Sequence, residues 1–278
     1  MEFKAVILEY AYELATLTLN RPGKRNAISP GMIEELLATL DDLEQSPARV
    51  AILTGAGKAF CAGMDLEALQ ALARRTPEHR VLKGGVLKGG LPRPSDANLA
   101  DSRRVARLFR RIYDFPKPLI AAVNGAAIAG GCGIATLCDF TLAAPEAKFG
   151  YSEVRIGFVP ALVSVFLVRQ IGEKRARDLL LSGRIIDASE AHRLGLVNEV
   201  VPLDKLLERA HALAEELLAS SPTSLIYTKR LLRELGEKEL DRELELALQE
   251  NARIRSTADF REGLTAFLEK RKPVWRGE

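Results

Sequence analysis

Two glycine-rich stretches carry the residues best suited to chemistry in this chain of 278 residues. They are residues 60–66 (FCAGMDL) and 124–133 (NGAAIAGGCG), and each follows an apolar run and precedes a segment with helical spacing. Backbone N–H groups at the start of a helix have no internal acceptor and lie at the positive end of the helix dipole. Two such turns that converge would form an oxyanion hole, which stabilises negative charge developing on a carbonyl oxygen. The alternative is that the glycines only permit close packing.

Regular elements must hold these turns in place. Residues 3–20 alternate apolar and polar side chains, which predicts a β-hairpin. Ser29 is a typical N-cap residue, and apolar side chains recur after it at helical spacing as far as Leu43. The apolar runs 50–54 and 119–123 predict short buried strands that end at glycine-containing turns. Strand, helix and strand at this spacing predict parallel crossover units, and therefore an α/β fold.

The remaining chain divides into two kinds of sequence. Between about Thr76 and Leu99 the periodicity disappears, which predicts a long loop that acts either as a lid over a ligand or as a surface linker. After Pro202 the apolar residues follow helical spacing only. We therefore expect an α/β core over residues 1–200 and a helical C-terminal region over residues 201–278.

Composition excludes several classes of protein. With 47% hydrophobic and 28% charged residues, the chain has the composition of a packed globular enzyme. Its 40 basic and 37 acidic residues nearly cancel, so we expect no nucleic-acid partner. Three cysteines indicate reduced thiols in the cytoplasm, and three histidines at wide spacing predict no metal site. The N-terminal residues do not resemble a targeting peptide, and no apolar run is long enough to span a membrane.

In order and spacing, the motifs of this chain resemble the enoyl-CoA hydratase/isomerase (crotonase) superfamily over nearly its whole length. The matching runs are residues 20–29 (NRPGKRNAIS), 54–66 (TGAGKAFCAGMDL), 117–125 (KPLIAAVNG), 129–139 (AGGCGIATLCD), 148–157 (KFGYSEVRIG) and 266–272 (AFLEKRK). The resemblance implies a crotonase-like spiral of ββα repeats with a helical C-terminal trimerisation region. It also implies an acyl-CoA thioester substrate and no separate cofactor, because coenzyme A is part of the substrate.

The resemblance assigns catalytic roles to three positions. The backbone N–H groups of Ala62 and Gly130 match the two oxyanion-hole donors for the thioester carbonyl. Glu153 matches one of the two catalytic glutamates, which exchanges a proton with the acyl chain. A carboxylate in a dry acyl pocket would have a raised pKa, which suits acid/base catalysis near neutral pH. Without the resemblance, Glu153 would be read as a surface ion-pair partner of Arg155.

Gly133 departs from the family pattern, because the second catalytic glutamate of the two-glutamate hydratases stands at this position. Adding water to a 2-enoyl thioester needs a base for water and an acid for carbon, although one carboxylate can serve both in turn. Moving a double bond from the 3- to the 2-position needs only one carboxylate. The segment 151–157 nevertheless resembles bacterial hydratases. We therefore expect a hydratase, with 3-enoyl-CoA isomerase and acyl-CoA decarboxylase as alternatives.

The coenzyme A end of the ligand is assigned by resemblance as well. Lys24 and Arg25 lie in the loop that approaches the coenzyme A phosphates, and such a ligand requires cations. Ala27 and Leu66 are placed along the bound ligand. Asp65 belongs to the same set, and we expect it to fix its turn rather than take part in chemistry.

The C-terminal positions Phe267 and Lys270 match residues that close the nucleotide pocket, often that of a neighbouring subunit. The resemblance therefore predicts a homotrimer or a dimer of trimers. A non-enzyme alternative is an acyl-CoA-binding or RNA-binding relative. The dispersed charge and the lack of paired aromatic residues disfavour RNA, and the presence of Glu153 disfavours an inactive site.

Overall fold

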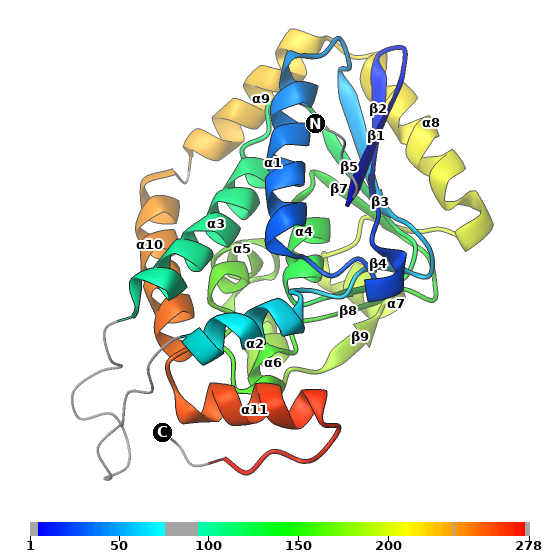
Figure 1. The fold of residues 1–278 in the computed structure, drawn as a ribbon. Helices are drawn as coiled ribbons and strands as arrows, with labels where there is room; N and C mark the ends of the chain where they lie inside the picture. Colours follow the sequence, from blue (N-terminus) through cyan, green and yellow to red (C-terminus); the bar gives the residue numbers. More distant parts are fainter. Residues whose placement is uncertain (1–4, 76–93, 236, 276–278) are drawn as a thin grey trace.

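The computed structural model describes residues 5–75, 94–235 and 237–275, and its strands form two sheets surrounded by helices (Figure 1). The larger sheet has the strand order β1-β2-β3-β5-β7-β10, and the smaller sheet has the order β4-β6-β8-β9. The strands of the larger sheet are β1 (Val6–Ala11), β2 (Leu14–Leu19), β3 (Val50–Gly55), β5 (Leu119–Val123), β7 (Phe140–Ala143) and β10 (Glu199–Val200). Those of the smaller sheet are β4 (Ala59–Cys61), β6 (Ala126–Ile128), β8 (Lys148–Gly150) and β9 (Ile185–Asp187).

Successive strand pairs divide between the two sheets. β3, β5 and β7 lie side by side in the larger sheet, and the strands that follow them, β4, β6 and β8, lie side by side in the smaller one. Helical segments follow each pair: α2 (Leu66–Arg75), α4 (Gly130–Leu137), and the short 3-10 helix η2 (Glu153–Ile156) with α5 (Ala161–Ile171). This is the predicted spiral of ββα repeats, and the prediction is confirmed.

The smaller sheet determines where the chemically interesting turns lie. β4 pairs with β6, and β6 pairs with β8, both in parallel. Parallel neighbours end at the same edge of a sheet. The two glycine-rich turns and the segment that begins with Glu153 follow the ends of these three strands, so the topology brings all three to one edge.

The N-terminal part folds as predicted from its local sequence. β1 and β2 form an antiparallel hairpin that pairs Val6 with Leu19 and Ala11 with Leu14. α1 (Pro30–Gln45) begins after Ser29, whose Oγ accepts a hydrogen bond from the N–H of Met32 at 3.2 Å. The apolar stripe from Ile33 to Leu43 is buried against the main core. An N-cap of this kind contributes about 1 kcal/mol to helix stability.

Helices cover both faces of the larger sheet (Figure 1). α1, α4 and α3 (Asp96–Tyr113) enclose the main core on one face. On the other face, α8 (Leu206–Leu218) packs Leu206, Ala210 and Ala214 against the strands. α8 therefore completes the sheet packing, although it lies within the helical region that begins near residue 201.

The described chain after β10 is helical. Besides α8, it contains η3 (Leu203–Lys205), α9 (Pro222–Glu234), α10 (Glu237–Ile254) and α11 (Ala258–Leu268). α10 lies against α3 and α5, and α11 lies against η2 and α2 (Figure 1). The remaining helices of the structure are η1 (Pro22–Lys24), α6 (Glu173–Ser182) and α7 (Ala188–Leu194).

The loop predicted between Thr76 and Leu99 needs a correction at its C-terminal end. Ser95 caps α3 by accepting a hydrogen bond from the N–H of Asn98 at 3.2 Å, and the helix begins at Asp96. The prediction was wrong for residues 96–99 because the helical stripe starts only after a polar first turn. Residues 76–93, where a lid or linker was expected, lie outside the described residues.

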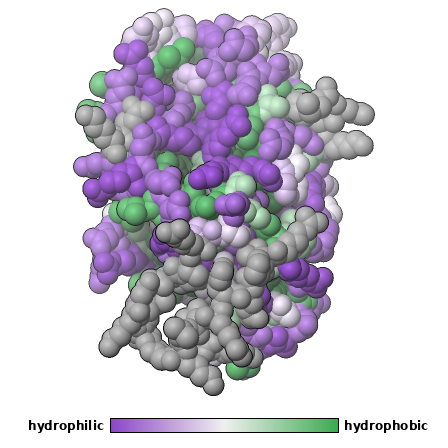
Figure 2. Space-filling view, turned by 60° about the vertical axis from the view of Figure 1, so that its left-hand side comes forward, coloured by the Kyte–Doolittle hydropathy of each residue, from purple (hydrophilic) through white to green (hydrophobic). Residues whose placement is uncertain are grey.

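Polar side chains dominate the coloured part of the face seen in Figure 2. In the view of Figure 2, hydrophilic residues cover most of the visible face, and hydrophobic ones gather in smaller groups among them. Each helix in the described part of the chain is too short or too polar to span a membrane. Cys61, Cys132 and Cys138 are free thiols in the interior, and burial raises the pKa of Cys61 to about 12, so this thiol stays protonated.

Candidate active site

Glu153 is a buried carboxylate at the edge of the smaller sheet. It is the first residue of η2, separated from the end of β8 by two residues, and only 8% of it is exposed. Its Oε2 atom is buried and has no hydrogen-bond partner among the described residues. Desolvation raises the pKa of Glu153 to about 7, opposed in part by its own backbone N–H. Near neutral pH this group can therefore both accept and donate a proton.

The interpretation of Glu153 as a surface partner of Arg155 is wrong. Arg155 is exposed, whereas Glu153 is buried and forms no ion pair with any residue that the structure describes. The 3-10 turn of η2 separates the two side chains, so closeness in sequence did not bring them together.

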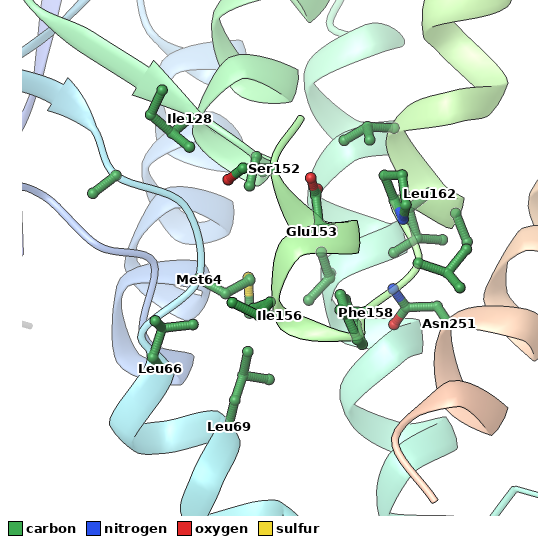
Figure 3. Close-up of a pocket in the computed structure, with 18 of the residues that line it drawn as sticks. Met64, Leu66, Leu69, Ile128, Ser152, Glu153, Ile156, Phe158, Leu162 and Asn251 are labelled. Atoms are coloured by element: carbon green, nitrogen blue, oxygen red, sulfur yellow. The ribbon is translucent and has the colours of Figure 1, made fainter. Parts of the chain in front are cut away.

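The pocket around Glu153 is apolar. It is a cavity of about 150 Å³ between α2, α3, η2, α5 and α10. Figure 3 shows Glu153 among hydrophobic side chains, including those of Met64, Leu69 and Ile156. The polar side chains on its described walls are those of Ser152, Glu153 and Asn251. Such a cavity would enclose a hydrocarbon chain and keep water away from the carboxylate.

The second glycine-rich turn supplies one backbone donor. Gly130 is the first residue of α4 and lines the pocket. Its N–H makes no hydrogen bond to a described residue, as expected at the start of a helix. Ala129, just before it, has φ of 52° and ψ of −124°, and its N–H donates to the Gly150 carbonyl oxygen at 2.7 Å. A non-glycine residue in this conformation is strained by about 1–3 kcal/mol, and such strain is typical of functional turns.

The structure contradicts the role predicted for Ala62 as a donor. Its N–H donates to the carbonyl oxygen of Arg25 at 3.0 Å, so it does not point free into the pocket. This hydrogen bond ties the turn to the loop at residues 21–27. Two residues further on, the N–H of Met64 makes no hydrogen bond to a described residue, and Met64 lines the pocket. The first turn therefore offers a donor at Met64 rather than at Ala62.

The two turns are in direct contact. A Cβ atom on Gly63, which has φ of +90°, would lie 2.9 Å from the Ile128 carbonyl oxygen and 3.7 Å from the Gly130 nitrogen. Only glycine tolerates both this φ and this approach. Gly63 therefore also allows close packing of the two turns, and Met64 and Gly130 both line the same pocket.

Gly133 lies in α4, at the position where the family pattern has the second glutamate. A Cβ atom there would lie 2.8 Å from Val163 Cγ1 and 3.4 Å from Phe109 Cζ. Apolar side chains from α5 and α3 therefore occupy the space beside Gly133. Its φ is not in the left-handed region, so crowding rather than backbone conformation limits this position. Among the described pocket residues, Glu153 is the only carboxylate.

Asp65 and Leu66 shape the start of α2. The Arg21 guanidinium donates to Asp65 Oδ2 at 2.9 Å, and Asp65 Oδ1 accepts from the Ala68 N–H at 3.4 Å. Asp65 thus fixes its turn, which agrees with the structural role expected from the sequence. Leu66 contributes to the pocket wall, whereas the carbonyl oxygen of Ala27 accepts a hydrogen bond from Arg21.

The predicted coenzyme A residues lie outside the acyl pocket. Lys24 is exposed and forms an ion pair with Glu67 at 2.7 Å, and Arg25 is exposed in a left-handed conformation. Lys270 is exposed beyond the end of α11. Phe267 is different, because it lines the same pocket as Glu153 within one chain while 58% of it remains exposed. Phe267 therefore lies at the pocket rim, and the phosphate contacts of Lys24, Arg25 and Lys270 stay predictions.

The chain thus has an α/β spiral of the crotonase type, and its buried carboxylate lines one pocket with Met64 and Gly130, whose N–H groups have no described acceptor. The family model for enoyl-CoA hydratase/isomerase matches residues 9–89 and 83–278. The chain belongs to the enoyl-CoA hydratase/isomerase family, and the resemblance seen in the sequence is confirmed.

Individual relatives match almost end to end. A Thermus thermophilus protein named "Putative enoyl-CoA hydratase" is 49% identical over 261 residues, which cover 94% of this chain and 96% of the relative. A crotonyl-CoA hydratase of Syntrophomonas wolfei is 34% identical, with 98% of each chain covered. The crystal structure of an enoyl-CoA hydratase/isomerase from Xanthobacter autotrophicus Py2 superposes with a TM-score of 0.83 at 31% identity, covering 97% of each chain.

Proposed function

We propose that this protein is an enoyl-CoA hydratase that adds water to a 2-enoyl-CoA with Glu153 as its single acid/base residue. One observation carries the proposal. A buried carboxylate with a pKa of about 7 lies in an apolar pocket that is also lined by Met64 and Gly130, whose backbone N–H groups have no acceptor among the described residues. Relatives named as hydratases support the same reaction.

The N–H groups of Met64 and Gly130 would hold the thioester oxygen. As water attacks C3, the electrons of the C2–C3 double bond move toward the thioester and leave negative charge on its oxygen. Donors already in place in a dry site stabilise this charge strongly, and losing one such donor costs other enzymes about 10²–10³ in kcat. We therefore assign the oxyanion hole to Met64 and Gly130 rather than to Ala62 and Gly130.

Glu153 would serve first as base and then as acid. Its carboxylate takes a proton from water while the water oxygen bonds to C3. The resulting carboxylic acid then returns that proton to C2 as the enolate collapses to the thioester, so one molecule of water is added. A pKa near 7 suits this cycle, because neither the proton uptake nor the proton release is strongly uphill.

A 3-enoyl-CoA isomerase is the second candidate, and Gly133 supports it. Val163 and Phe109 stand beside this position, so the described pocket wall holds no second carboxylate to bind the attacking water. An isomerase needs no water and only one group to carry a proton between C2 and C4. The hydratase remains our first proposal, because named hydratases match the chain over almost its full length.

We also propose contacts for the coenzyme A part of the ligand and an oligomeric state for the protein. We assign Lys24 and Arg25 to the coenzyme A phosphates, since both side chains are exposed on the loop that the Ala62 N–H ties to the first turn. Phe267 would close the mouth of the pocket. We also propose a homotrimer or a dimer of trimers located in the cytoplasm, and inorganic cofactors have no part in this mechanism.

Purified protein would be tested against crotonyl-CoA, a 3-enoyl-CoA and malonyl-CoA. We expect loss of the conjugated thioester absorbance with crotonyl-CoA, and formation of 3-hydroxybutyryl-CoA by mass spectrometry. Glu153→Gln should lower this rate by about two to four orders of magnitude, while Glu146→Gln, on an exposed turn, should leave it unchanged. Conversion of only the 3-enoyl-CoA would identify an isomerase, and full activity in Glu153→Gln would refute the assignment.

A further inference from the structure

Asn251 is a buried amide in the wall of the acyl pocket that the proposed reaction does not use. It belongs to α10, only 5% of it is exposed, and it lines the cavity that holds Glu153. Its Oδ1 atom accepts hydrogen bonds from Ser102 Oγ at 2.8 Å and from Arg255 Nη2 at 2.9 Å. Because a guanidinium only donates, the atom facing Arg255 must be the oxygen, which fixes the orientation of the amide.

The amide nitrogen of Asn251 therefore points elsewhere. Nδ2 makes no hydrogen bond to any residue in the described ranges, and it is not one of the fully buried atoms that lack a partner, so it is accessible from the cavity that Asn251 lines. When an acyl chain displaces water from the cavity, a donor left without an acceptor costs about as much as a lost hydrogen bond. In a mostly apolar cavity, such a group indicates that the bound ligand supplies the acceptor.

The surrounding network holds Asn251 in place. The Arg255 side chain is only 3% exposed, pairs with Asp101 of α3, and lies 5.4 Å from the centre of the Phe158 ring. Phe158 itself lines the pocket. Fixing the amide beforehand removes the entropy cost of ordering it on binding, as in a site built for one hydrogen bond.

Asn251 lies away from the reacting end of the pocket. In Figure 3 its side chain reaches from α10 toward Phe158, and Ile128 of the oxyanion turn lies on the opposite side of the view. Glu153 lies between them, and its carboxylate points away from Asn251. An acyl chain whose thioester contacts Gly130 would therefore extend past Glu153 toward Asn251.

We propose that Asn251 is a specificity-determining residue that donates a hydrogen bond to an oxygen atom on the acyl chain beyond the double bond. The substrate class is then a 2-enoyl-CoA that carries a hydroxyl or carbonyl group on its chain. This inference rests on the proposed function for the reaction, but the recognition itself concerns binding alone.

The acceptor is neutral rather than a carboxylate. Arg255, the cation behind Asn251, already pairs with Asp101, so no charge remains to balance an anionic acyl chain. Moving an unpaired carboxylate into an apolar cavity costs far more than one amide hydrogen bond returns. A hydroxyl or carbonyl oxygen needs only the single donor that Nδ2 offers.

Binding and turnover would be measured separately. Calorimetry would measure the affinity for three kinds of saturated acyl-CoA of equal chain length. The first ends in a methyl group, the second carries a hydroxyl or keto group at successive positions from C5 to C7, and the third ends in a carboxylate. The wild type should bind one of the neutral oxygenated chains about tenfold more tightly than the hydrocarbon. For the corresponding 2-enoyl-CoAs, kcat/KM of the preferred oxygenated substrate should exceed that of the hydrocarbon substrate by the same factor.

Asn251→Asp is the decisive variant, because it keeps an oxygen for Ser102 and Arg255 but removes the donor. It should abolish the tenfold preference while hydrocarbon substrates are still turned over. If Asn251→Asp folds poorly, Asn251→Leu provides a second test, because it also lacks the donor and should also abolish the preference. The matched control is Ser152→Ala, which removes another polar pocket side chain and should keep the preference.

Three results would overturn the inference. They are equal affinity of the wild type for all neutral chains, preference for the carboxylate, and loss of the preference in Ser152→Ala but not in Asn251→Asp. A fourth result would also overturn it: a uniform fall in kcat of Asn251→Asp on every substrate, with the binding preference unchanged, would place the residue at the reacting centre. If hydration fails with every substrate while the binding preference holds, the proposed function fails and this inference stands.

Discussion

Replacing Glu153 with glutamine should make the protein's stability less sensitive to pH. In the folded protein the carboxyl is buried without a partner for Oε2, and desolvation raises its pKa from 4.5 to about 7. In the unfolded chain the same carboxyl titrates near its ordinary value. The folded state therefore binds this proton more tightly than the unfolded state, and the two states respond differently to pH.

The sign and size follow from these two pKa values. Below pH 4.5 both states are protonated, and the contribution of the neutral carboxyl to stability is fully present. Between pH 4.5 and 7 the unfolded chain releases the proton first, so the free energy of unfolding falls as pH rises through the folded pKa. Each pKa unit corresponds to about 1.4 kcal/mol, which gives a total loss of about 3 kcal/mol by pH 8.5.

Urea unfolding of wild type and Glu153→Gln at pH 4.5, 6, 7 and 8.5 measures this difference. The glutamine has its own constant cost as a buried amide, so the informative quantity is the change in the wild-type minus variant difference with pH. Other carboxylates titrate in both proteins and cancel. The exposed Glu146→Gln serves as the control and should follow the wild type at every pH. If the difference in unfolding free energy between wild type and Glu153→Gln stays constant within about 0.5 kcal/mol from pH 4.5 to 8.5, Glu153 is not desolvated. The argument that Glu153 is an acid/base residue with a raised pKa would then be refuted.

Three further predictions concern the remaining parts of the site. Gly133→Glu should lower the free energy of unfolding by about 1–3 kcal/mol without raising the rate of crotonyl-CoA hydration, because Val163 blocks the new side chain. Adding Val163→Ala should restore stability. A folded Gly133→Glu variant that hydrates crotonyl-CoA faster than the wild type would refute this prediction. Met64→Pro, which removes the proposed N–H donor, should lower kcat by about 10²–10³, whereas Met64→Leu should stay near wild type in the same assay. Lys24→Ala with Arg25→Ala should raise KM roughly three- to tenfold and change kcat less, and an unchanged KM would show that this loop does not contact coenzyme A.

Much of the fold could be read from local sequence, because local signals determine it. The cap at Ser29, the apolar stripe that follows it and the strands near residues 50 and 119 each depend on residues close to them in the chain. The start of α3 was missed because its polar first turn lacks the apolar spacing that marks a helix.

The candidate site divides in the same way. Glu153 and Gly130 were found from motifs, and the structure places both on one pocket wall. The donor predicted in the first turn, the N–H of Ala62, is already hydrogen-bonded to Arg25, whereas the N–H of Met64 has no acceptor among the described residues. Sequence spacing locates a turn, but it does not show which peptide N–H points into the pocket and which one, like that of Ala62, is used by a neighbouring loop.

Short motifs in a fixed order were enough to predict the family, the order of the ββα units and Glu153 as the candidate acid/base residue. The pKa of that carboxylate and the residues that surround it depend on the tertiary structure. Its raised pKa comes from burial by several helices, the space beside Gly133 is filled by Phe109 and Val163, and Asn251 enters the pocket from α10. Desolvation, steric fit and unpaired donors arise from contacts between residues far apart in the chain. Local sequence patterns do not predict such contacts.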